Sequence, residues 1–329
     1  MKAAWYERTG APHDVLLVGD MSVPEVGPGE VLVRVAMSGI NPHDTKKRAG
    51  WLGRPMPAMR IIPHADAAGT IAMVGPGVPE VRVGERVWVV RADTVRPGSG
   101  AAAQYAVVPA KHAFPLPDTV PFETGASLGV PGLTAHRAVF AEGPVTGQTL
   151  LITGGAGAVA TYAIQLARWN GARVLATVSS PEKAASARAM GADEVIDYRR
   201  QDVAAEVLRL TGAQGVDRII EVDFGSNLEV CHKVIRPGGV IAAYSSTRAP
   251  EPTLPYYAFA AKGVTLHFIQ GMLLTDDMRR VAGRDINALL ARGLLQHPAP
   301  FTLPLARIAD AHAALESGTV AGKVLVASP

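Results

Sequence analysis

Two patterns of hydrophobic and polar residues divide the chain. From residue 1 to about residue 121, short apolar runs alternate with turns rich in glycine and proline, which predicts a compact unit of β-strands. The clearest of these runs are Glu30–Val35, Gly69–Val74, Arg86–Val90 and Gln104–Val108. From about residue 122, apolar runs alternate with helical segments, a pattern typical of a parallel sheet with helices on both faces.

The second region contains six candidate strands, the number expected of a complete dinucleotide-binding fold. They are Leu150–Thr153, Arg173–Val178, Glu194–Ile196, Asp217–Val222, Val240–Tyr244 and Val264–Ile269. We therefore expect an α/β protein whose residues 122–269 form a Rossmann domain with a doubly wound, parallel six-stranded sheet.

The last sixty residues, 270–329, follow neither pattern and mix helical segments with short apolar runs. They predict helices over Asp276–Arg292 and Ile308–Glu316 and short strands over Phe301–Leu303 and Lys323–Val326. Because these strands are too few to form a core of their own, we expect them to join the N-terminal β unit. The predicted domains are then residues 1–121 with 270–329, and residues 122–269.

A glycine-rich turn between a predicted strand and a predicted helix indicates where a cofactor binds. Gly155, Gly157 and Ala160 have the G-x-G-x-x-G/A spacing that brings a backbone against a pyrophosphate. The helix start that follows, with Ala158 and Val159, offers N–H groups and a helix dipole to an anion. A glycine-rich hairpin is the alternative for this segment.

The end of the next strand indicates which nicotinamide cofactor is used. No acidic residue stands about 20 positions on, where NAD-binding proteins bind the ribose hydroxyl. Ser179, Ser180 and Lys183 are found there instead, and they favour the 2′-phosphate of NADPH. The segment Ser180-Pro181-Glu182 also fits an ordinary capped helix start, and both interpretations can hold together.

Composition and charge restrict the remaining classes of function. A chain of 329 residues predicts two domains, and a single cysteine, Cys231, excludes an internal disulfide or a multi-cysteine zinc site. The N-terminal residues lack a signal-peptide pattern and the uncharged stretch 143–167 contains glycines and a proline, so we expect a cytoplasmic protein without a membrane span. The run Lys46-Lys47-Arg48 allows nucleic-acid binding, but a helix end or an anion-attracting pocket is favoured.

Seven segments give the chain an end-to-end resemblance to a known family. They are 24–45 (PEVGPGEVLVRVAMSGINPHDT), 69–87 (GTIAMVGPGVPEVRVGERV), 132–139 (GLTAHRAV), 163–168 (AIQLAR), 191–199 (GADEVIDYR), 236–241 (RPGGVI) and 311–326 (AHAALESGTVAGKVLV). With these, the chain resembles the zinc-free quinone oxidoreductases of the zeta-crystallin type, within the medium-chain dehydrogenase/reductase superfamily. The resemblance implies a GroES-like β catalytic domain, an inserted nucleotide domain, and a homodimer formed through the last sheet strands.

The chain departs from the zinc-dependent relatives where they bind metal. They have a cysteine at the position of Asn41 and a histidine at that of Ala65, and they carry a four-cysteine lobe that is missing here. An amide and a methyl group are not zinc ligands, so we expect no metal. His64, one residue earlier, is interpreted as a cleft or loop histidine. Lys46 replaces the family's usual tyrosine and adds a cation or proton donor near the expected pocket, with an exposed lysine as the alternative.

The resemblance also assigns site residues one at a time. Asn41 is the family's pocket residue beside the nicotinamide, and Asp44 belongs to the same motif. Expected cofactor contacts are Thr134 at the nicotinamide end, Tyr198 near the adenosine phosphate, and Tyr244 and Ser246 after the fifth strand of the nucleotide domain.

The implied chemistry is hydride transfer from NADPH to an electron-poor acceptor. Without a Lewis acid to polarise an isolated carbonyl, a conjugated acceptor is favoured, because it spreads the incoming charge. A quinone is the first expectation, with an α,β-unsaturated carbonyl as the alternative. Asn41 and Lys46 are candidate hydrogen-bond or proton donors, and water is another proton source. A non-catalytic, cofactor-binding or RNA-binding role is the remaining alternative.

Overall fold

The chain folds into two compact units. The computed structural model describes residues 1–318, 320 and 322–329. One unit comprises residues 1–130 and 279–329, and the other comprises residues 131–278. Within the described residues, no helix is long and apolar enough to cross a membrane.

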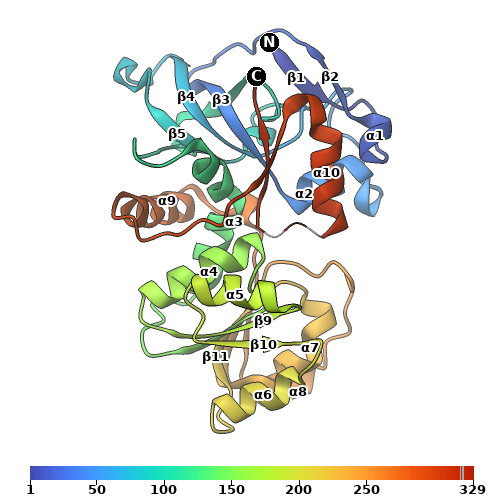
Figure 1. Cartoon of the computed structure of the whole chain (residues 1–329), viewed down its shortest axis with the longest axis vertical. Coiled ribbons are helices and arrows are strands. Elements are labelled where there is room, and N and C mark those ends of the chain that lie inside the picture. The colour runs from blue at the N-terminus through green and yellow to red at the C-terminus, as the bar shows by residue number, and fades with distance from the viewer. Residues whose placement is uncertain (319, 321) are drawn as a thin grey trace. The chain divides into compact units, whose positions relative to one another are not determined.

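The first unit is built on a seven-stranded sheet with the strand order β14-β15-β3-β4-β5-β7, in which β6 also pairs with β3. A separate antiparallel pair, β1 with β2, lies at the N-terminus. Figure 1 shows both chain ends in this unit. Its strands are β1 (Lys2–Trp5), β2 (Leu17–Asp20), β3 (Glu30–Ile40), β4 (Asp66–Val74), β5 (Arg86–Val89), β6 (Tyr105–Pro109), β7 (Ala113–Pro115), β14 (Phe301–Pro304) and β15 (Val324–Ala327).

The C-terminal strands complete this sheet, as the sequence predicts. β15 pairs antiparallel with β3, so that Val324 lies opposite Ile40 and Val326 opposite Ser38. β3 is longer than predicted because it continues past Val35 to Ile40, beside the helix that carries the candidate site. This pairing places residues from both ends of the sequence at one end of the sheet.

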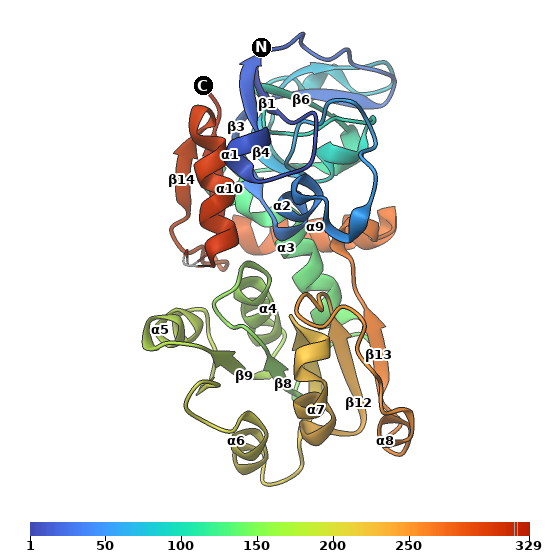
Figure 2. The same ribbon diagram turned by 90° about the vertical axis from the view of Figure 1, so that its right-hand side faces the viewer.

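Helices cover the edges of the first unit. α10 packs against β14, β15, α1 and α2, and Figures 1 and 2 show it beside the red C-terminal strands. The helices are α1 (Pro12–Val15), α2 (Pro42–Ala49) and α10 (Ile308–Ser317), with short 3₁₀ turns η1 (Trp51–Gly53), η2 (Glu80–Arg82), η3 (Ala92–Thr94), η4 (Ala110–His112) and η6 (Leu305–Arg307).

The second unit is the predicted doubly wound fold. Its six strands are all parallel and follow the order β10-β9-β8-β11-β12-β13, which is the order expected of a dinucleotide-binding sheet. The strands are β8 (Thr149–Ile152), β9 (Arg173–Val178), β10 (Glu194–Asp197), β11 (Val216–Glu221), β12 (Ile235–Ala243) and β13 (Thr265–Phe268). Each differs from its predicted bounds by a few residues at most, apart from β12, which begins five residues earlier at Ile235.

Helices lie on both faces of this parallel sheet. Figure 1 shows α4 and α5 on one face and α6 and α7 on the other. The strands between them are almost fully buried, so Leu151, Leu175 and Ile219 pack into a continuous apolar core. The helices are α4 (Ala158–Trp169), α5 (Pro181–Ala189), α6 (Val203–Leu210), α7 (Phe224–Val234) and α8 (Tyr256–Ala260), with a 3₁₀ turn η5 (Gly271–Leu273).

The boundaries between the units fall inside helices, and not at the predicted residues 121/122 and 269/270. α3 (Phe122–Phe140) crosses from one unit to the other near a break at Gly129, and α9 (Asp276–Ala291) crosses at residue 278. The first turns of α3 pack closely on the first unit, where the Gly125 backbone approaches Ala68. The hydrophobic pattern of the sequence changes where α3 begins, whereas the first turns of α3 contact the first unit.

Candidate functional site

A buried three-residue network surrounds the side-chain amide of Asn41. Lys323 Nζ donates to Asn41 Oδ1 at 2.6 Å and lies 3.3 Å from Asp66 Oδ2. Asn41 Nδ2 in turn donates to Asp66 Oδ2 at 2.7 Å. Asn41, Asp66 and Lys323 are all buried. The network thus joins the start of α2, the start of β4 and the residue just before β15.

The neighbours of Asn41 fix the orientation of its amide. Lysine only donates hydrogen bonds and an ionised carboxylate only accepts them, so the Asn41 oxygen must face Lys323 and its nitrogen must face Asp66. The amide nitrogen carries two hydrogens, and Asp66 takes one of them. The second N–H group of Asn41 remains as a donor with a defined direction.

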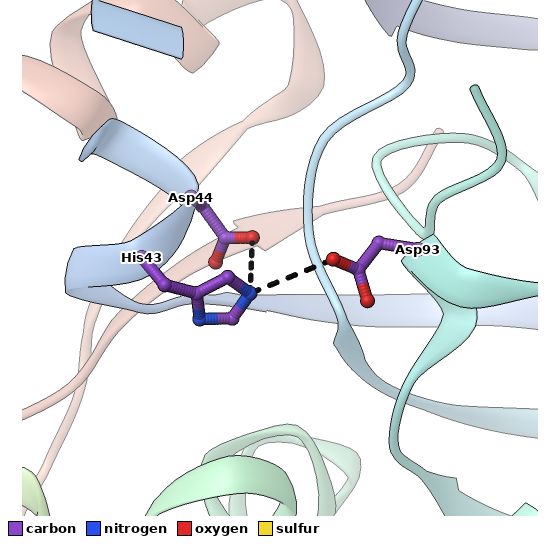
Figure 3. A group of neighbouring side chains, drawn as sticks. All are labelled: His43, Asp44 and Asp93. Carbon is purple, nitrogen blue, oxygen red and sulfur yellow. Dashed lines mark ion pairs between the residues drawn. The ribbon is translucent and has the colours of Figure 1, made fainter. Parts of the chain in front are cut away.

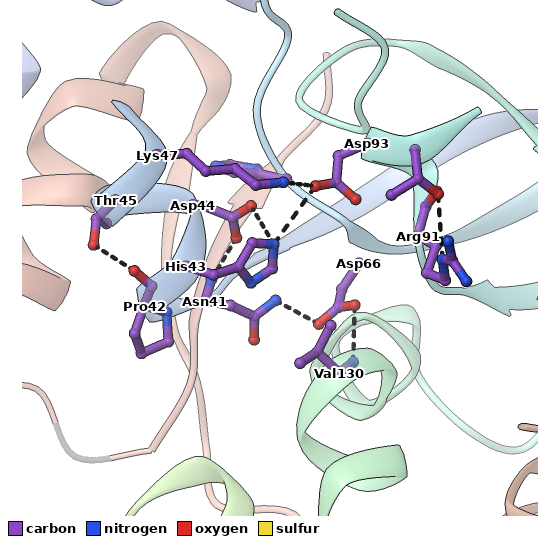
Figure 4. Close-up of polar contacts among 12 residues, drawn as sticks. Asn41, Pro42, His43, Asp44, Thr45, Lys47, Asp66, Arg91, Asp93 and Val130 are labelled. Carbon is purple, nitrogen blue, oxygen red and sulfur yellow. Dashed lines mark hydrogen bonds and ion pairs between the residues drawn. The ribbon is translucent and has the colours of Figure 1, made fainter. Parts of the chain in front are cut away.

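Two glycines make room for this network. A side chain at Gly39, in β3, would meet the Ala126 carbonyl and would approach Lys323 Cε to 2.9 Å. A side chain at Gly129, at the break in α3, would collide with the Asp66 carboxylate. The break frees the Val130 N–H, which donates to Asp66 Oδ1 at 2.9 Å (Figure 4). Asp66 therefore accepts bonds from three separate segments.

Asp44, predicted as a site residue, supports Asn41 from the same helix. Its Oδ2 accepts the main-chain N–H of Asn41 at 2.7 Å, which is the usual role of an acid in the first turn of a helix. Asp44 is buried, and burial raises the pKa of its carboxyl group above the usual range. The structure thus gives Asp44 a helix-capping contact with the main chain of Asn41.

His43 and Asp93 join Asp44 in a second polar cluster that the sequence analysis missed. His43 Nε2 lies 3.2 Å from Asp44 Oδ1 and 3.7 Å from Asp93 Oδ2 (Figure 3). Asp93 belongs to η3, about fifty residues further along the chain. The sequence gives no spacing signal for this pair, because turns of a β domain bring it together.

Lys47 supplies a further charge to this cluster. Its ammonium group bonds Asp93 Oδ2, as Figure 4 shows. In the described part of the chain, His43, Asp44 and Asp93 are the three side chains whose ligand atoms come within metal-binding range of one another. Two of the carboxylate oxygens already accept bonds, one from Lys47 and one from the Asn41 main chain. The donor set thus fits an internal ion-pair cluster better than a vacant cation site.

The three basic residues of α2 are engaged within the first unit. The Lys46 ammonium lies 4.5 Å from the centre of the Trp51 ring, Lys47 bonds Asp93, and the buried Arg48 bonds Glu316 and the Gly10 carbonyl. The Lys46 ammonium therefore stacks on an exposed aromatic ring. Because Lys46, Lys47 and Arg48 all contact other residues of the first unit, their interpretation as a helix end is favoured over nucleic-acid binding.

His64 is a core residue. It is fully buried, with φ of 76°, and its Nδ1 lies 2.9 Å from Ser38 Oγ. Its Nε2 lies 3.0 Å from Nε2 of His312, which is also fully buried. Burial lowers the pKa of His64 well below its usual value and that of His312 to about 3. Both rings are therefore neutral, and their contact is a structural hydrogen bond.

The glycine turn of the second unit has the geometry of a phosphate cradle. β8 ends at Ile152 and α4 begins at Ala158, with Gly157 as its N-cap. The first main-chain bond of the helix runs from Thr161 N to Gly157 O, which leaves the N–H groups of Ala158, Val159 and Ala160 without an intrahelical acceptor. A Cβ at Gly155 would lie 2.9 Å from the Ala176 Cβ, so a larger residue cannot fit.

Thr177, at the end of β9, shapes this turn. Its hydroxyl accepts the Gly154 N–H at 3.1 Å, and its carbonyl accepts the Gly155 N–H at 2.8 Å. The turn therefore lies directly against the second strand of the sheet. These residues fit a dinucleotide pyrophosphate. The glycines leave the main chain accessible, the N–H groups at the start of α4 have no intrahelical acceptor, and Thr177 supports the turn.

The predicted 2′-phosphate residues lie at the end of β9. Ser179 is buried at the strand end, and Ser180 Oγ accepts the Lys183 N–H at 3.3 Å as the N-cap of α5. The Lys183 ammonium forms no hydrogen bond or ion pair with another described residue. An open surface pocket of about 290 Å³ adjoins them, with Ser180, Arg188, Asp197 and Arg200 among its lining residues. Arg188 and Arg200 are cations that the sequence analysis missed.

The remaining predicted cofactor residues are dispersed over the second unit. Thr134 is buried in α3. Tyr198 follows β10 and is half-exposed, at 46%. Tyr244 follows β12, where burial raises the pKa of its hydroxyl. Ser246 accepts the Gly225 N–H at 2.9 Å, so its hydroxyl supports the turn at the start of α7. Thr134 therefore lies in α3, Tyr198 follows β10, and Tyr244 and Ser246 follow β12.

Comparisons with known proteins agree with this architecture. Residues 27–118 match the family model "Alcohol dehydrogenase GroES-like domain", and residues 158–284 match "Zinc-binding dehydrogenase". A quinone oxidoreductase of Rattus norvegicus is 35% identical over 240 residues, which cover 73% of this chain and 71% of the relative. A 2-haloacrylate reductase of a Burkholderia species is 34% identical over 250 residues, which cover 74% of this chain and 72% of the reductase. A mycobacterial structure solved in complex with NADPH is 28% identical and has a TM-score of 0.88. The match covers 99% of this chain and 100% of the mycobacterial chain.

Fold and matches together define a medium-chain dehydrogenase/reductase, with a GroES-like domain and a Rossmann domain. The chain belongs to the quinone oxidoreductase family of that superfamily, whose members are oxidoreductases.

Proposed function

We propose that this protein is an NADPH-dependent oxidoreductase that reduces a quinone without a metal ion. The observation that carries the proposal is the Asn41–Lys323–Asp66 network. At the position of a zinc ligand, an amide is held between an ammonium and a carboxylate, with one N–H group still available. That N–H is a hydrogen-bond donor for an oxygen that gains negative charge.

The bound cofactor supplies hydride. The protein's contribution is to bind and align the reactants and to supply hydrogen bonds and a proton. The donors at the start of α4 are suited to the pyrophosphate, and Ser180 with Lys183 is suited to a 2′-phosphate. The mycobacterial relative solved with NADPH supports the same choice of cofactor.

An enone or a related activated alkene is the second candidate acceptor. The similarity to a 2-haloacrylate reductase favours it, because that name describes reduction of a carbon–carbon double bond conjugated to a carboxylate. Both acceptors place the incoming charge on an oxygen remote from the carbon attacked. They differ in the final proton, which goes to oxygen in a hydroquinone and to carbon in a saturated ketone.

A homodimer formed through β13 is part of the proposal. β13 is the last strand of the parallel sheet, and its outer edge has no strand partner among the described residues. Phe268, at its end, is 77% exposed. An unpaired sheet edge with a large exposed aromatic residue is suited to pairing with a second copy.

Steady-state kinetics test the proposal. NADPH and NADH are each supplied with a benzoquinone and with a cyclic enone, and their oxidation is followed at the nicotinamide absorbance. We expect NADPH to be preferred and the quinone to be the better acceptor. Equal use of the two cofactors would contradict the cofactor assignment, and reduction of the enone alone would select the second candidate.

A further inference from the structure

His43 has two differently placed ring nitrogens. Nε2 points between the carboxylates of Asp44 and Asp93, whereas Nδ1 points away from both (Figure 3). The Nε2 atom is buried, but a quarter of the side chain, 25%, reaches solvent. His43 also lies two residues after Asn41, in the first turn of α2. Nε2 therefore lies within ion-pair distance of two acids, whereas Nδ1 points away from both.

We propose that His43 is the proton donor that completes reduction of the acceptor, with Asp44 and Asp93 as the residues that position and charge its ring. This inference rests on the proposed function. Neither Asn41 nor Lys46, the donors expected from the sequence, has this arrangement: Asn41 is an amide, and the Lys46 ammonium lies over Trp51.

The charges around His43 favour its protonated form. Burial by itself lowers the pKa of the imidazole, but the negative charges of Asp44 and Asp93 outweigh burial, so the net pKa is raised. Lys47, which bonds Asp93, acts in the opposite direction. Burial, together with the negative charges of Asp44 and Asp93, raises the pKa of the Tyr6 hydroxyl to about 12, so Tyr6 stays neutral. The neighbouring His64 is neutral as well.

The arrangement resembles a general acid more than a structural ion pair. A donor should be charged near neutral pH, and it should have one nitrogen fixed by a carboxylate and the other open to the reactant. His13 shows the contrast: its side chain is 59% exposed, and among the described residues one acid, Asp310, pairs with it at 2.9 Å. His43 differs in having two acids on its buried nitrogen.

The proposed step balances without a further reactant. Hydride brings two electrons to the acceptor, which is left as an enolate or a hydroquinone anion. The His43 Nδ1–H bond breaks, and its proton forms an O–H bond in the hydroquinone or a C–H bond alpha to the carbonyl. His43 becomes neutral, and solvent water restores its proton.

Kinetics of His43→Gln provide the first test, with His13→Gln as the matched control. We expect His43→Gln to lower kcat by about 100-fold with the enone, as loss of a general acid does. The wild-type kcat should fall as the pH rises above the pKa of His43, and this fall should be missing in His43→Gln. His13→Gln should retain both the rate and the pH profile.

Histidine-ring NMR titration of the protein without cofactor provides a readout independent of turnover. The resonance missing in His43→Gln identifies the ring. We expect its pKa to lie above 6.5, the usual value for histidine. Asp93→Asn should lower the pKa and Lys47→Gln should raise it, because these two substitutions remove charges of opposite sign next to the ring.

The product configuration separates a donor from a merely structural residue. With an alpha-substituted enone, a fixed donor protonates one face of the enolate, so wild type should give one enantiomer and His43→Gln a nearly racemic product. A His43→Gln enzyme with unchanged rate, pH profile and enantiomeric excess would overturn the proposal, as would a ring pKa below 6.5 or stoichiometric zinc lost on Asp93→Asn. Wild-type protein that reduces neither acceptor would instead overturn the proposed function itself.

Discussion

Lys323 and Asn41 are separated by 282 positions in the sequence, yet Lys323 Nζ lies 2.6 Å from Asn41 Oδ1. β15 makes this contact possible by returning to pair with β3, just before α2 begins. Burial lowers the pKa of Lys323, and the charges of Asp66 and Asp44 partly restore it. The contact places a buried ammonium group directly beside the Asn41 amide.

Replacing Lys323 should destabilise the protein and disorder the Asn41 amide. Lys323→Met leaves Asp66 as a buried carboxylate with one fewer partner, and breaking a buried pair costs about 3–5 kcal/mol of unfolding free energy. Urea denaturation measures this loss. Lys2→Met, which removes an exposed pair with Asp20, is the control and should stay within about 1 kcal/mol of wild type. Equal stabilities of the two variants would show that the buried pair is not formed.

Lys183→Gln should reduce the preference for NADPH over NADH. The Lys183 ammonium makes no bond with described residues, so its removal affects a bound 2′-phosphate more than the fold. Loss of one charged hydrogen bond predicts a decrease of about tenfold in the ratio of the two kcat/KM values. Lys233→Gln, on an exposed pair with Glu229, is the control. An unchanged ratio would assign phosphate selection to Arg188 or Arg200, which line the adjoining pocket.

Ser180→Ala should show a different combination of effects. Ser180 caps α5, so its loss should lower the unfolding free energy by about 1 kcal/mol in addition to any change in cofactor preference. Thermal unfolding without cofactor measures the first effect alone. A variant with weaker NADPH binding but unchanged stability would contradict the capping contact.

The pair His64 and His312 should make stability depend on pH on the acid side. In the folded protein, burial lowers the pKa of His312 to about 3, whereas the unfolded chain has a value of about 6.5. Between these values only the unfolded state binds the proton. The contribution of the neutral His312 ring to the free energy of unfolding is therefore complete above pH 6.5. It decreases towards pH 3, by up to about 1.4 kcal/mol per pH unit.

Urea denaturation at pH 7.5 and pH 5 measures this dependence. We expect His312→Gln to show a smaller loss of stability between the two pH values than wild type, because one of the two neutral rings is gone. His13→Gln, at an exposed position, should keep the wild-type difference. A wild-type stability that rises towards pH 5 would contradict the neutral, buried state of the pair.

The edge strand β13 provides a test of the dimer. Phe268 is 77% exposed in the single chain, and Phe268→Glu would bring a charge to the proposed interface. Light scattering after size exclusion should give twice the chain mass of 34.4 kDa for wild type and a smaller mass for the variant. A wild-type monomer would contradict pairing through β13.

Much of the nucleotide-binding unit can be predicted from the sequence. Its strands are buried apolar runs and the turn at Gly155 and Gly157 is local, so each element leaves its own signal in consecutive residues. The division between the two units leaves a weaker signal in the sequence, since α3 and α9 each continue from one unit into the other.

The polar site was only partly predictable. Asn41 and Asp44 lie in one recognisable motif, and their contact spans a single helical turn. Lys323, Asp66 and Asp93 reach them through strand pairing and turns far away in the sequence, and no spacing rule connects those positions. Gly39 lies in β3 and Gly129 at the break in α3, and the side chains that need the space beside them become visible only in the fold.

The most direct test of the central claim combines metal analysis with acceptor specificity. Purified protein is dialysed against a chelator, its zinc content is measured, and NADPH oxidation is followed with a quinone, an enone and a simple ketone. The Asn41–Lys323–Asp66 network predicts full activity with an electron-poor acceptor at negligible zinc content, and little activity with the ketone. Stoichiometric zinc, together with alcohol or ketone turnover that the chelator abolishes, would contradict it.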